Sequence, residues 1–360
     1  MKISAFWCGV NTIADSIALL PKHIYNKTEK TKTRLQDHAV TYLIHKEPNQ
    51  CMTAFNFWFT MAVSAIVKGK GFARIVRNAG GAIVELQLLH PEDVTVYRQN
   101  GQLWYKVSGV KEYLFSDEIF HINGFSWDGI TGIGVVQYAA DSMSVSLEAD
   151  VYAADAYGDR GVSYGVIETD TSGLDNLGKK NLKKVFSHHL DSSDKHRVAV
   201  LDEGMKYKRI ALSPAEAQFI EAKTQGVEDI ARWLKIPLHK LHAKGEGGYN
   251  FLVQMSIEYM QTAVQPLAER IKEEIERKLL TKAEKKAGNF VFINYRKLLE
   301  ADPKARAQYY KDLWFIRAIN SNEIRDLEDM EPYVGGDDFL QPANMLSELQ
   351  LKKQTENEGE

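Results

Sequence analysis

The stretch from Ser213 to Leu280 constrains the fold more than any other part of the chain, because its pattern predicts a helix, a glycine-rich loop and a second, long helix. The first helix opens with a capping box, in which Ser213 can accept from a backbone amide and Glu216 can reach back, with Pro214 at the tolerated first position. Apolar residues then follow at helical spacing until Pro237 ends the run. Both limits of this helix are therefore set by the sequence.

The loop between the two helices, Leu241 to Asn250, holds three glycines in four residues and cannot adopt regular structure cheaply. Beyond it, residues 251 to 280 predict a helix of about 45 Å at 1.5 Å per residue, which Pro266 should kink midway. The stretch contains no recognisable catalytic constellation. A flexible loop between two rigid helices is better suited to contact with a moving partner than to binding of a substrate.

Composition narrows the class of protein without naming it. A chain of 360 residues is long enough for two or three domains, and a formal net charge of −3 is too small to indicate nucleic-acid binding through a strong basic field. Cys8 and Cys51 match no metal spacing and are predicted to be reduced core residues of a cytosolic protein. The most apolar window, Ala54 to Val67, is shorter than the roughly 20 residues that a bilayer requires, so it predicts a buried helix and no membrane association.

The first third of the chain predicts an α+β domain. Apolar residues from Phe6 to Leu20 step at helical spacing up to Pro21, and a polar, apparently exposed linker follows over Asn26 to Gln36. The period then changes to two, which predicts a single antiparallel sheet. Its expected strands are Phe72–Arg77, Ala82–Leu89, Val94–Arg98, Gln102–Val107 and Glu118–Ile122.

The remainder predicts helices with a small insert. A helix rich in Ala and Ser is expected over residues 135 to 160, and its small side chains would let another helix approach closely. Residues 162 to 212 predict an α/β module with a strand at Tyr164–Ile167, a basic helix at Leu177–Leu190 and a strand pair at Arg197–Leu201 and Lys206–Ala211. A strand at Phe290–Asn294 and helices near 303–318 and 323–330 follow, the last opened by Asn320 with Glu323 at capping-box spacing.

Residues that invite an enzymatic interpretation are explained better without one. His239 and His242 have no third ligand nearby in sequence, and the loop around Lys244 lacks the residue order of a phosphate-binding loop. The i, i+4 pairs Glu273 with Arg277 and Glu274 with Lys278 predict weak pairs on a solvated helix face, worth about 0.2 to 0.5 kcal/mol each. The sequence therefore predicts no enzyme, no cofactor and no metal site.

Taken together, the ordered segments resemble the portal proteins, or head-tail connectors, of tailed double-stranded DNA bacteriophages. The resemblance covers nearly the whole chain, and its specificity lies in the order and spacing of segments that are weak one by one. These segments are Ala5–Pro21, Leu88–Pro91, Glu118–Ile122, Asp128-Gly129 with Gly132, Val200–Met205, Asp229–Pro237, Asn322–Arg325 and Gly335-Gly336.

The resemblance implies a phage portal fold with named parts. Residues 1–134 would form the wing, with helices and an antiparallel sheet, and 135–161 and 213–237 the two stem helices on either side of a small α/β clip at 162–212. Residues 238–250 would be the tunnel loop, 251–300 the tunnel helix and the return to the wing, 301–346 the short helical crown and 347–360 a disordered tail. Portal proteins usually carry an extra polar segment before the first helix, whereas this chain begins almost inside it, so an alternative start codon, a trimmed chain or a degenerate prophage copy are open.

The resemblance also implies a function and partners. The chain would form a ring, typically of twelve subunits, at one capsid vertex of the virion, after assembly in the host cytoplasm. Double-stranded DNA would pass through the ring during packaging and ejection, and the ring would contact the terminase motor, the major capsid protein and a head-tail adaptor. The DNA-facing loop residues would be His242, Lys244, Gly245, Glu246, Gly247, Gly248 and Asn250, and Ala149 and Ala153 are expected at the subunit interface.

Two other classes of protein stay open at this point. One is a cytosolic hydrolase or transferase whose α/β insert carries an unfamiliar site. The other is a monomeric helical adaptor that binds protein and forms no channel. For the loop itself, the plain alternative is a disordered surface loop, because glycine-rich loops are common. The mass of the particle in solution separates a ring from both other classes.

Overall fold

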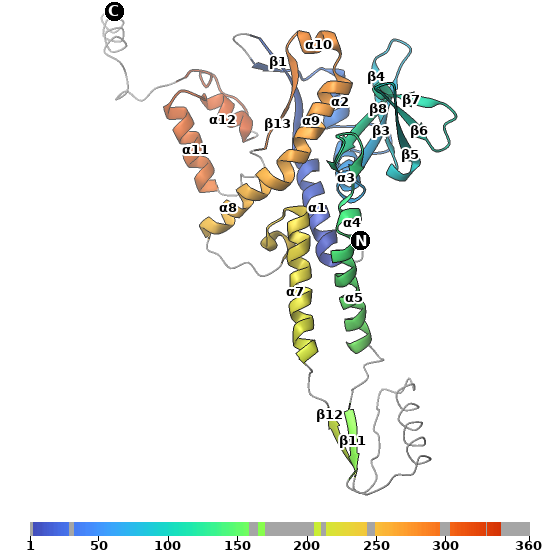
Figure 1. The fold of residues 1–360 in the computed structure, drawn as a ribbon. Helices are drawn as coiled ribbons and strands as arrows, with labels where there is room; N and C mark the ends of the chain where they lie inside the picture. The colour runs from blue at the N-terminus through green and yellow to red at the C-terminus, as the bar shows by residue number, and fades with distance from the viewer. Residues whose placement is uncertain are drawn as a thin grey trace, which may run out of the picture. The chain divides into compact units, whose positions relative to one another are not determined.

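The structure is a computed structural model that describes residues 3–28, 32–157, 165–169, 205–209, 214–242, 249–295, 303–328 and 330–339. It divides into two compact units, residues 1–294 and 295–360. Helices and small antiparallel sheets alternate in the first unit (Figure 1). The predicted α+β class is therefore confirmed.

The N-terminal helix forms where the apolar stripe predicted it. Helix α1 (Ser4–Leu19) buries Phe6, Val10, Ile13 and Ile17, and the chain leaves it in an extended conformation at Leu20. It packs against α3 (Ala54–Val67), whose start is capped by the Thr53 hydroxyl. The short helix α2 (Ala39–His45) precedes α3. These helices bury the apolar window, as expected for a globular core.

The predicted polar linker is wrong in part, because five of its eleven residues lie in two strands. Strand β1 (Lys22–Lys27) lies between β2 (Lys32–Arg34) and β13 (Asn289–Ile293), with antiparallel pairing on both sides. The polar composition concealed β1, whose buried apolar side chain is Ile24. The sheet instead gains an aromatic face, where Lys32 Nζ lies 3.7 Å from the centroid of Phe292. A cation over aromatic rings can hold an exposed strand that has no apolar core side chain of its own.

Residues 70 to 123 form two sheets where one was predicted. The five expected strands are all present, and a further short strand, β7, completes the second sheet. The first sheet has the order β4-β3-β8 and the second β5-β6-β7. Their bounds are β3 (Lys70–Arg77), β4 (Ile83–Leu89), β5 (Val94–Gln99), β6 (Gln102–Val107), β7 (Tyr113–Phe115) and β8 (Ile119–Asn123), with the 3-10 turns η1 (Pro91–Asp93) and η2 (Ser116–Glu118). Phe72, Tyr105 and Ile119 pack in one core between them, a contact that alternation alone does not reveal.

The single helix predicted over residues 135 to 160 is interrupted. Helix α4 (Val135–Tyr138) ends at Ala139, whose backbone leaves the helical region, and α5 (Ala140–Tyr157) follows. Ala139 is buried and the Tyr138 ring contacts Trp233, so tertiary packing overrides the local preference for helix here. Before α4, the two-residue strands β9 (Phe125–Ser126) and β10 (Gly132–Ile133) close a tight turn.

The insert is described only at its base. Strand β11 (Gly165–Thr169) pairs antiparallel with β12 (Met205–Arg209). The first and last predicted strands of the insert thus pair with each other, whereas β12 was expected to pair with Arg197–Leu201. That segment and the predicted basic helix Leu177–Leu190 lie outside the described residues.

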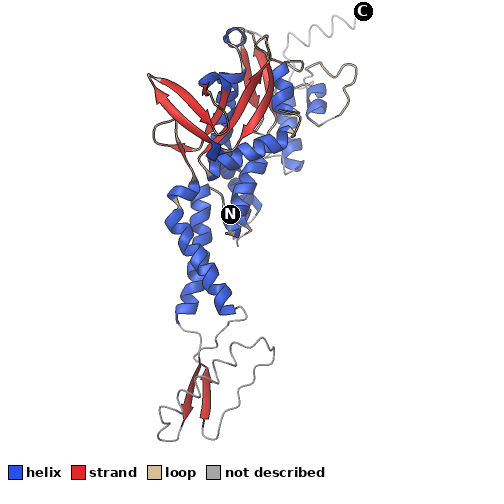
Figure 2. Ribbon diagram, turned by 90° about the vertical axis from the view of Figure 1, so that its right-hand side faces the viewer, coloured by secondary structure: helices blue, strands red, loops and turns tan. Residues whose placement is uncertain are grey.

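The helical region after the insert follows the predicted order. Helix α7 (Pro214–Leu234) lies beside α5, as the two long helices in Figures 1 and 2 show. Its end comes before Pro237, because Lys235 adopts a left-handed backbone with φ of 56°. Ser213, the predicted cap of this helix, lies outside the described residues. The 3-10 turn η3 (Leu238–Leu241) follows.

The long helix predicted over residues 251 to 280 is interrupted beside Pro266, where a kink was predicted. Helix α8 (Tyr249–Tyr259) runs into a π-helical turn, η4 (Met260–Val264), and α9 (Gln265–Leu279) continues with Pro266 in its first turn. The Gln265 amide bonds to the Met260 carbonyl, five residues back. Because proline has no amide hydrogen, a change of hydrogen-bond register beside it is expected. Helix α10 (Lys282–Lys286) then leads into β13.

The second unit confirms the predicted helix start at Asn320. Helix α11 (Pro303–Phe315) precedes α12 (Ser321–Leu327). The Asn320 side chain accepts the Glu323 amide at 2.8 Å, and the Glu323 carboxylate accepts the Asn320 amide at 2.9 Å. The predicted tail at 347–360 lies outside the described residues.

Candidate functional site

The predicted DNA-facing loop begins at a residue with a well-defined backbone conformation. At His242 the backbone is left-handed, with φ of 55°, and its amide bonds back to the carbonyls of η3. A non-glycine residue in this conformation costs free energy unless its surroundings hold it there. The His242 side chain is exposed. The turn η3 therefore ends at His242, and the described structure resumes at Tyr249.

The N-terminal side of the loop is anchored on α1. Leu234, Ile236 and Leu241 are buried, and all three lie around Gly9. A Cβ atom at Gly9 would come within 2.5 Å of Leu234 Cδ1 and 3.2 Å of Leu241 Cδ2. A side chain at Gly9 would therefore force the Leu234 side chain to shift. Nearby, Cys8 Sγ lies 3.7 Å from the Lys240 carbonyl oxygen as a weak donor.

Helix α8, which follows the loop, contacts the same helix at its C-terminal end. Tyr259, at the end of α8, donates its hydroxyl to the Thr12 carbonyl at 3.0 Å and lies 2.9 Å from the Ser16 hydroxyl. Burial raises the pKa of Tyr259 to about 12, so this donor keeps its proton. Lys240 Nζ lies 5.5 Å from the Tyr259 ring centroid and links the two anchors. The turn before the loop and the far end of the helix after it are thus both held on α1.

The two cysteines lie in different environments from those predicted. Cys8 in α1 is half-buried and Cys51 is exposed in a turn. The prediction that both are core residues is wrong for Cys51, because Asn49 and Met52 form a bridge that turns this segment before the buried face of α3 begins.

The pair α5 and α7 combines close approach with exposed apolar side chains. The Ser142 hydroxyl lies 3.4 Å from an Asp229 carboxylate oxygen, and a Cβ at Gly226 would come within 2.5 Å of Ser146 Oγ. On α5, Val145, Leu147 and Val151 are exposed. A two-helix element that leaves apolar side chains in solvent presents surface for other polypeptides.

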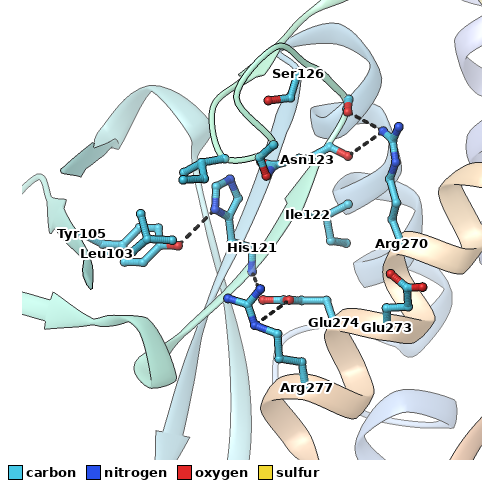
Figure 3. A pocket seen from close by; sticks show the side chains of 13 residues that line it. Leu103, Tyr105, His121, Ile122, Asn123, Ser126, Arg270, Glu273, Glu274 and Arg277 are labelled. Carbon is cyan, nitrogen blue, oxygen red and sulfur yellow. Dashed lines mark hydrogen bonds and ion pairs between the residues drawn. The ribbon is translucent and has the colours of Figure 1, made fainter. Parts of the chain in front are cut away.

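A polar cleft of about 340 Å³ lies between β8 and α9 (Figure 3). Glu274 reaches from α9 to the His121 backbone, and Arg270 donates to the carbonyls of Asn123 and Gly124. The side chains of Glu274 and Lys278 are both buried, with Lys278 Nζ 4.0 Å from Glu274 Oε1. The prediction of weak pairs on a solvated face is therefore wrong for Glu274 and Lys278, since this face of α9 covers the sheet.

Burial governs the electrostatics of the cleft. It raises the pKa of Glu274 against the opposing effect of Arg277 and Lys278, and it lowers the pKa of Lys278. Burial, followed by the charges of Lys278, Lys70 and Arg277, lowers the pKa of His121 to about 3, so its imidazole is neutral at physiological pH. His121 Nε2 and Asn123 Oδ1 are buried without a hydrogen-bond partner among the described residues. Water can satisfy such groups in a polar cleft of this size.

Sequence reasoning missed this cleft because nothing local connects its members. Glu274 and Lys278 have the same i, i+4 spacing as an exposed pair, and His121 is one of five residues of an apparently ordinary strand. The usable signal was the apolar pattern of α9, since Ile271 and Ile275 flank Glu274 on the buried face. A carboxylate within such a stripe indicates a buried partner.

The described residues include neither a metal-binding cluster nor a membrane-spanning helix. Across them, no three His, Cys, Asp or Glu side chains gather in an arrangement that could hold a metal ion. His239 and His242 flank Lys240 and Leu241, and burial lowers the pKa of His239. No helix in the described part of the chain has both the length and the apolar content needed to cross a membrane.

Comparison with known proteins identifies the family. Residues 4–329 match the phage portal protein family. The chain belongs to that family. The resemblance predicted from the ordered segments is thus confirmed over nearly the whole length of this portal protein.

Individual portal proteins agree with this assignment. The portal protein of Enterobacteria phage HK97 is 24% identical over 368 residues, which cover 100% of this chain and 86% of the phage protein. The probable portal protein of Streptomyces phage phiC31 is also 24% identical, over 96% of this chain and 79% of its own length.

Solved portal structures share the fold. An HK97-family phage portal protein from Corynebacterium diphtheriae superposes with a TM-score of 0.58 at 14% identity, over 83% of this chain and 95% of that chain. A chain from the neck of a native gene transfer agent particle, computed with C12 symmetry, superposes with a TM-score of 0.60 at 18% identity, over 92% and 91% of the two chains.

The predicted site residues of this portal protein are only partly described. His242 lies at the exposed exit of η3, and Asn250 lies in the first turn of α8. Lys244, Gly245, Glu246, Gly247 and Gly248 lie outside the described residues. Ala149 and Ala153 lie in α5, although their side chains are outside what the structure describes. Contact of the loop with DNA and of α5 with a second subunit stay predictions.

Proposed function

We propose that this chain is the subunit of a ring-shaped channel at one vertex of a phage capsid, through which double-stranded DNA passes during packaging and ejection. The observation that carries the proposal is the match to the portal family over residues 4–329. The symmetric necks in which structural relatives occur, with C12 or C6 symmetry, support a closed ring, and twelve is the proposed number of copies. The ring belongs to the virion and assembles in the host cytoplasm.

We assign the parts of the portal fold as follows. Residues 1–134 are the wing, 135–161 and 213–237 the stem helices, 162–212 the clip, 238–250 the tunnel loop, 251–300 the tunnel helix and the return to the wing, and 301–346 the crown. The pairing of α5 with α7 supports the stem assignment, and the β11–β12 pair at the base of the insert supports the clip.

In this proposal the tunnel loop contacts DNA transiently. The contacts of Leu241 with Gly9, before the loop, and of Tyr259 with Thr12, at the far end of α8, support a loop that can change conformation while the flanking elements stay on α1. Lys244 is the proposed phosphate contact, with His242 and Asn250 as weaker contributors. One lysine offset by Glu246 gives little net attraction, which suits a duplex that must slide, and no sequence-specific readout is expected.

Subunits would associate through the stem and the insert. Helix α5, with Ala149 and Ala153, is the proposed contact between subunits, and its exposed Val145, Leu147 and Val151 supply apolar area. The outer edge of the insert would contact the terminase motor. The major capsid protein and a head-tail adaptor are the remaining proposed partners.

The chain would have no catalytic activity of its own, since the energy for packaging would come from the terminase motor. No Walker motif or paired-acid motif is present in the sequence. Light scattering of the purified full chain tests the ring, because about twelve copies give a particle many times the mass of the 40.8 kDa chain. A species of one or two chains under all conditions, or ATP turnover that disappears on mutating one of its own acidic residues, would contradict the proposal.

A further inference from the structure

Four aromatic side chains form an exposed row on the first unit. The ring centroids of Trp127 and Phe125 are 5.1 Å apart, those of Phe125 and Tyr138 5.9 Å, and those of Tyr138 and Trp233 5.3 Å. The exposed fractions are 83% for Trp127, 46% for Phe125, 38% for Tyr138 and 39% for Trp233. The first two pairs are edge-to-face and the third is tilted, and these contacts hold the rings in place while much of their area stays in water.

The turn that presents Trp127 is rigid. Asp128 Oδ1 accepts hydrogen bonds from the Ile130 amide at 2.8 Å and the Thr131 amide at 2.6 Å. These bonds hold the pKa of Asp128 well below its usual range. Trp127 is therefore exposed although the backbone beside it is well ordered.

The same turn is pinned to the rest of the unit by glycines that admit no side chain. A Cβ at Gly132 would lie 1.6 Å from the Gly69 carbonyl oxygen, and one at Gly134 would lie 2.0 Å from the Val67 carbonyl oxygen. On the other side, Arg270 holds the carbonyl of Gly124 (Figure 3). A surface aromatic on a preorganised platform loses little conformational entropy when it is covered, as in the central residues of protein interfaces.

We propose that this aromatic row, Phe125, Trp127, Tyr138 and Trp233, is covered by a second copy of this chain in the assembled ring. The inference rests on the proposed function and names one surface that the ring would bury. An isolated copy would leave four large rings in water, and tryptophan and tyrosine are the residues most enriched in interface centres.

The aromatic row adjoins the proposed stem contact between subunits, so a second copy of this chain is the partner that we expect to cover it. Tyr138 and Trp233 lie on α4 and α7, and α5 begins two residues after Tyr138, with the Met143 amide donating to the Ala139 carbonyl at 2.9 Å. Val145 on α5, a short distance along the chain from Tyr138, is also exposed. The row thus extends the apolar surface of α5, and a head-to-tail ring contact needs such a patch on only one side of each subunit.

The test compares full-length Trp127→Ala with wild type, with Tyr113→Ala as the matched control. Tyr113 is 52% exposed and contacts the Tyr97 ring within the β5-β6-β7 sheet, which holds no member of the aromatic row. Light scattering over a dilution series should show that Trp127→Ala rings dissociate at a concentration at least tenfold higher than wild-type rings, whereas Tyr113→Ala rings behave as wild type. Circular dichroism establishes that each variant is folded.

A second measurement uses wild type and Trp127→Phe, whose difference in fluorescence isolates the emission of Trp127. Acrylamide should quench this emission strongly in the dissociated chain and weakly in the ring. The inference is overturned if Trp127 stays equally quenchable in the ring or if Trp127→Ala rings resist dilution as well as wild type. Those outcomes leave the ring itself intact, whereas a wild-type chain that never assembles would contradict the proposed function.

Discussion

Glu274 Oε1 accepts the backbone amide of His121 at 3.4 Å, and this contact closes the outer edge of a sheet with a helix side chain. Strand β8 is the last strand in the order β4-β3-β8, so the His121 amide has no strand partner on that side. Arg270, one turn earlier on α9, donates to the Asn123 carbonyl of the same strand at 3.0 Å. Side chains of α9 thus protect an edge that could otherwise pair with another chain.

Replacing Glu274 with Gln should change how stability depends on pH. Burial raises the pKa of Glu274, so the folded chain keeps this proton to a higher pH than the unfolded chain. The folded state then binds more protons in a window beginning at about pH 4.5, and the free energy of unfolding falls there as pH rises. Wild type should lose stability relative to Glu274→Gln as pH rises through this window, measured by urea unfolding at fixed protein concentration.

Glu273→Gln is the control for this experiment, because Glu273 is adjacent in sequence but exposed. Its effect should stay within about 0.5 kcal/mol at every pH. A wild-type chain that gains stability relative to Glu274→Gln over the same window would show that Arg277 and Lys278 outweigh burial.

Gly132 should tolerate no side chain. A Cβ there would lie 1.6 Å from the Gly69 carbonyl oxygen, a backbone atom that cannot rotate away. Gly132→Ala should lower the free energy of unfolding by about 3 kcal/mol or more. Gly80→Ala, whose Cβ would meet only the Asn78 side chain at 3.4 Å, should change it by less than about 0.5 kcal/mol. If thermal unfolding shows equal loss of stability in the Gly132→Ala and Gly80→Ala variants, the close approach of Gly132 to the Gly69 carbonyl is contradicted.

Much of the fold could be predicted because its signals are local. The capping box of Asn320, the strand period in residues 72 to 122 and the kink at Pro266 each depend on a few neighbouring residues. Strand β1 was missed because its pairing with β13 joins residues more than 260 positions apart, and no local pattern reports such a pair. The break at Ala139 was missed for the same reason, since it depends on contacts of Tyr138 with other elements.

Replacing Ala149 or Ala153 with Trp should block ring formation. Both residues lie in α5, and a large ring at a close contact between helices overpacks it. Sedimentation of each full-length variant should show dissociated chains with the helical content of wild type. Val84→Trp, at an exposed position on β4, is the control and should form normal rings. Normal rings from both Trp variants would show that α5 does not lie in the contact between subunits.

Deleting residues 243 to 248 should reduce DNA packaging without preventing ring assembly. Both anchors of the loop, Leu241 on Gly9 and Tyr259 on Thr12, lie outside the deleted segment. Rings should therefore form, while packaging or retention of DNA in a complete assembly reaction should fall. Lys244→Gln should have a weaker effect in the same direction, because it removes one phosphate contact. Unchanged packaging by the deletion variant would show that the loop is only a surface loop.

The functional sites were predictable to different degrees. A glycine-rich loop between two helices is visible in the sequence because both helix limits have local signals. The contacts of its flanking elements with α1 were not predictable, since Leu241 lies on Gly9 and Tyr259 bonds to Thr12 across more than 230 residues of sequence. The aromatic row likewise joins β9, α4 and α7, and each of its members looks like an ordinary core residue in sequence.

A cryo-electron microscopy reconstruction of the purified full-length chain would show whether it forms the proposed channel. We expect a closed ring of about twelve copies, with the loop between His242 and Tyr249 directed toward the central hole and α5 contacting a neighbouring copy. A ring with this loop on its outer wall, or particles of one or two chains, would contradict it.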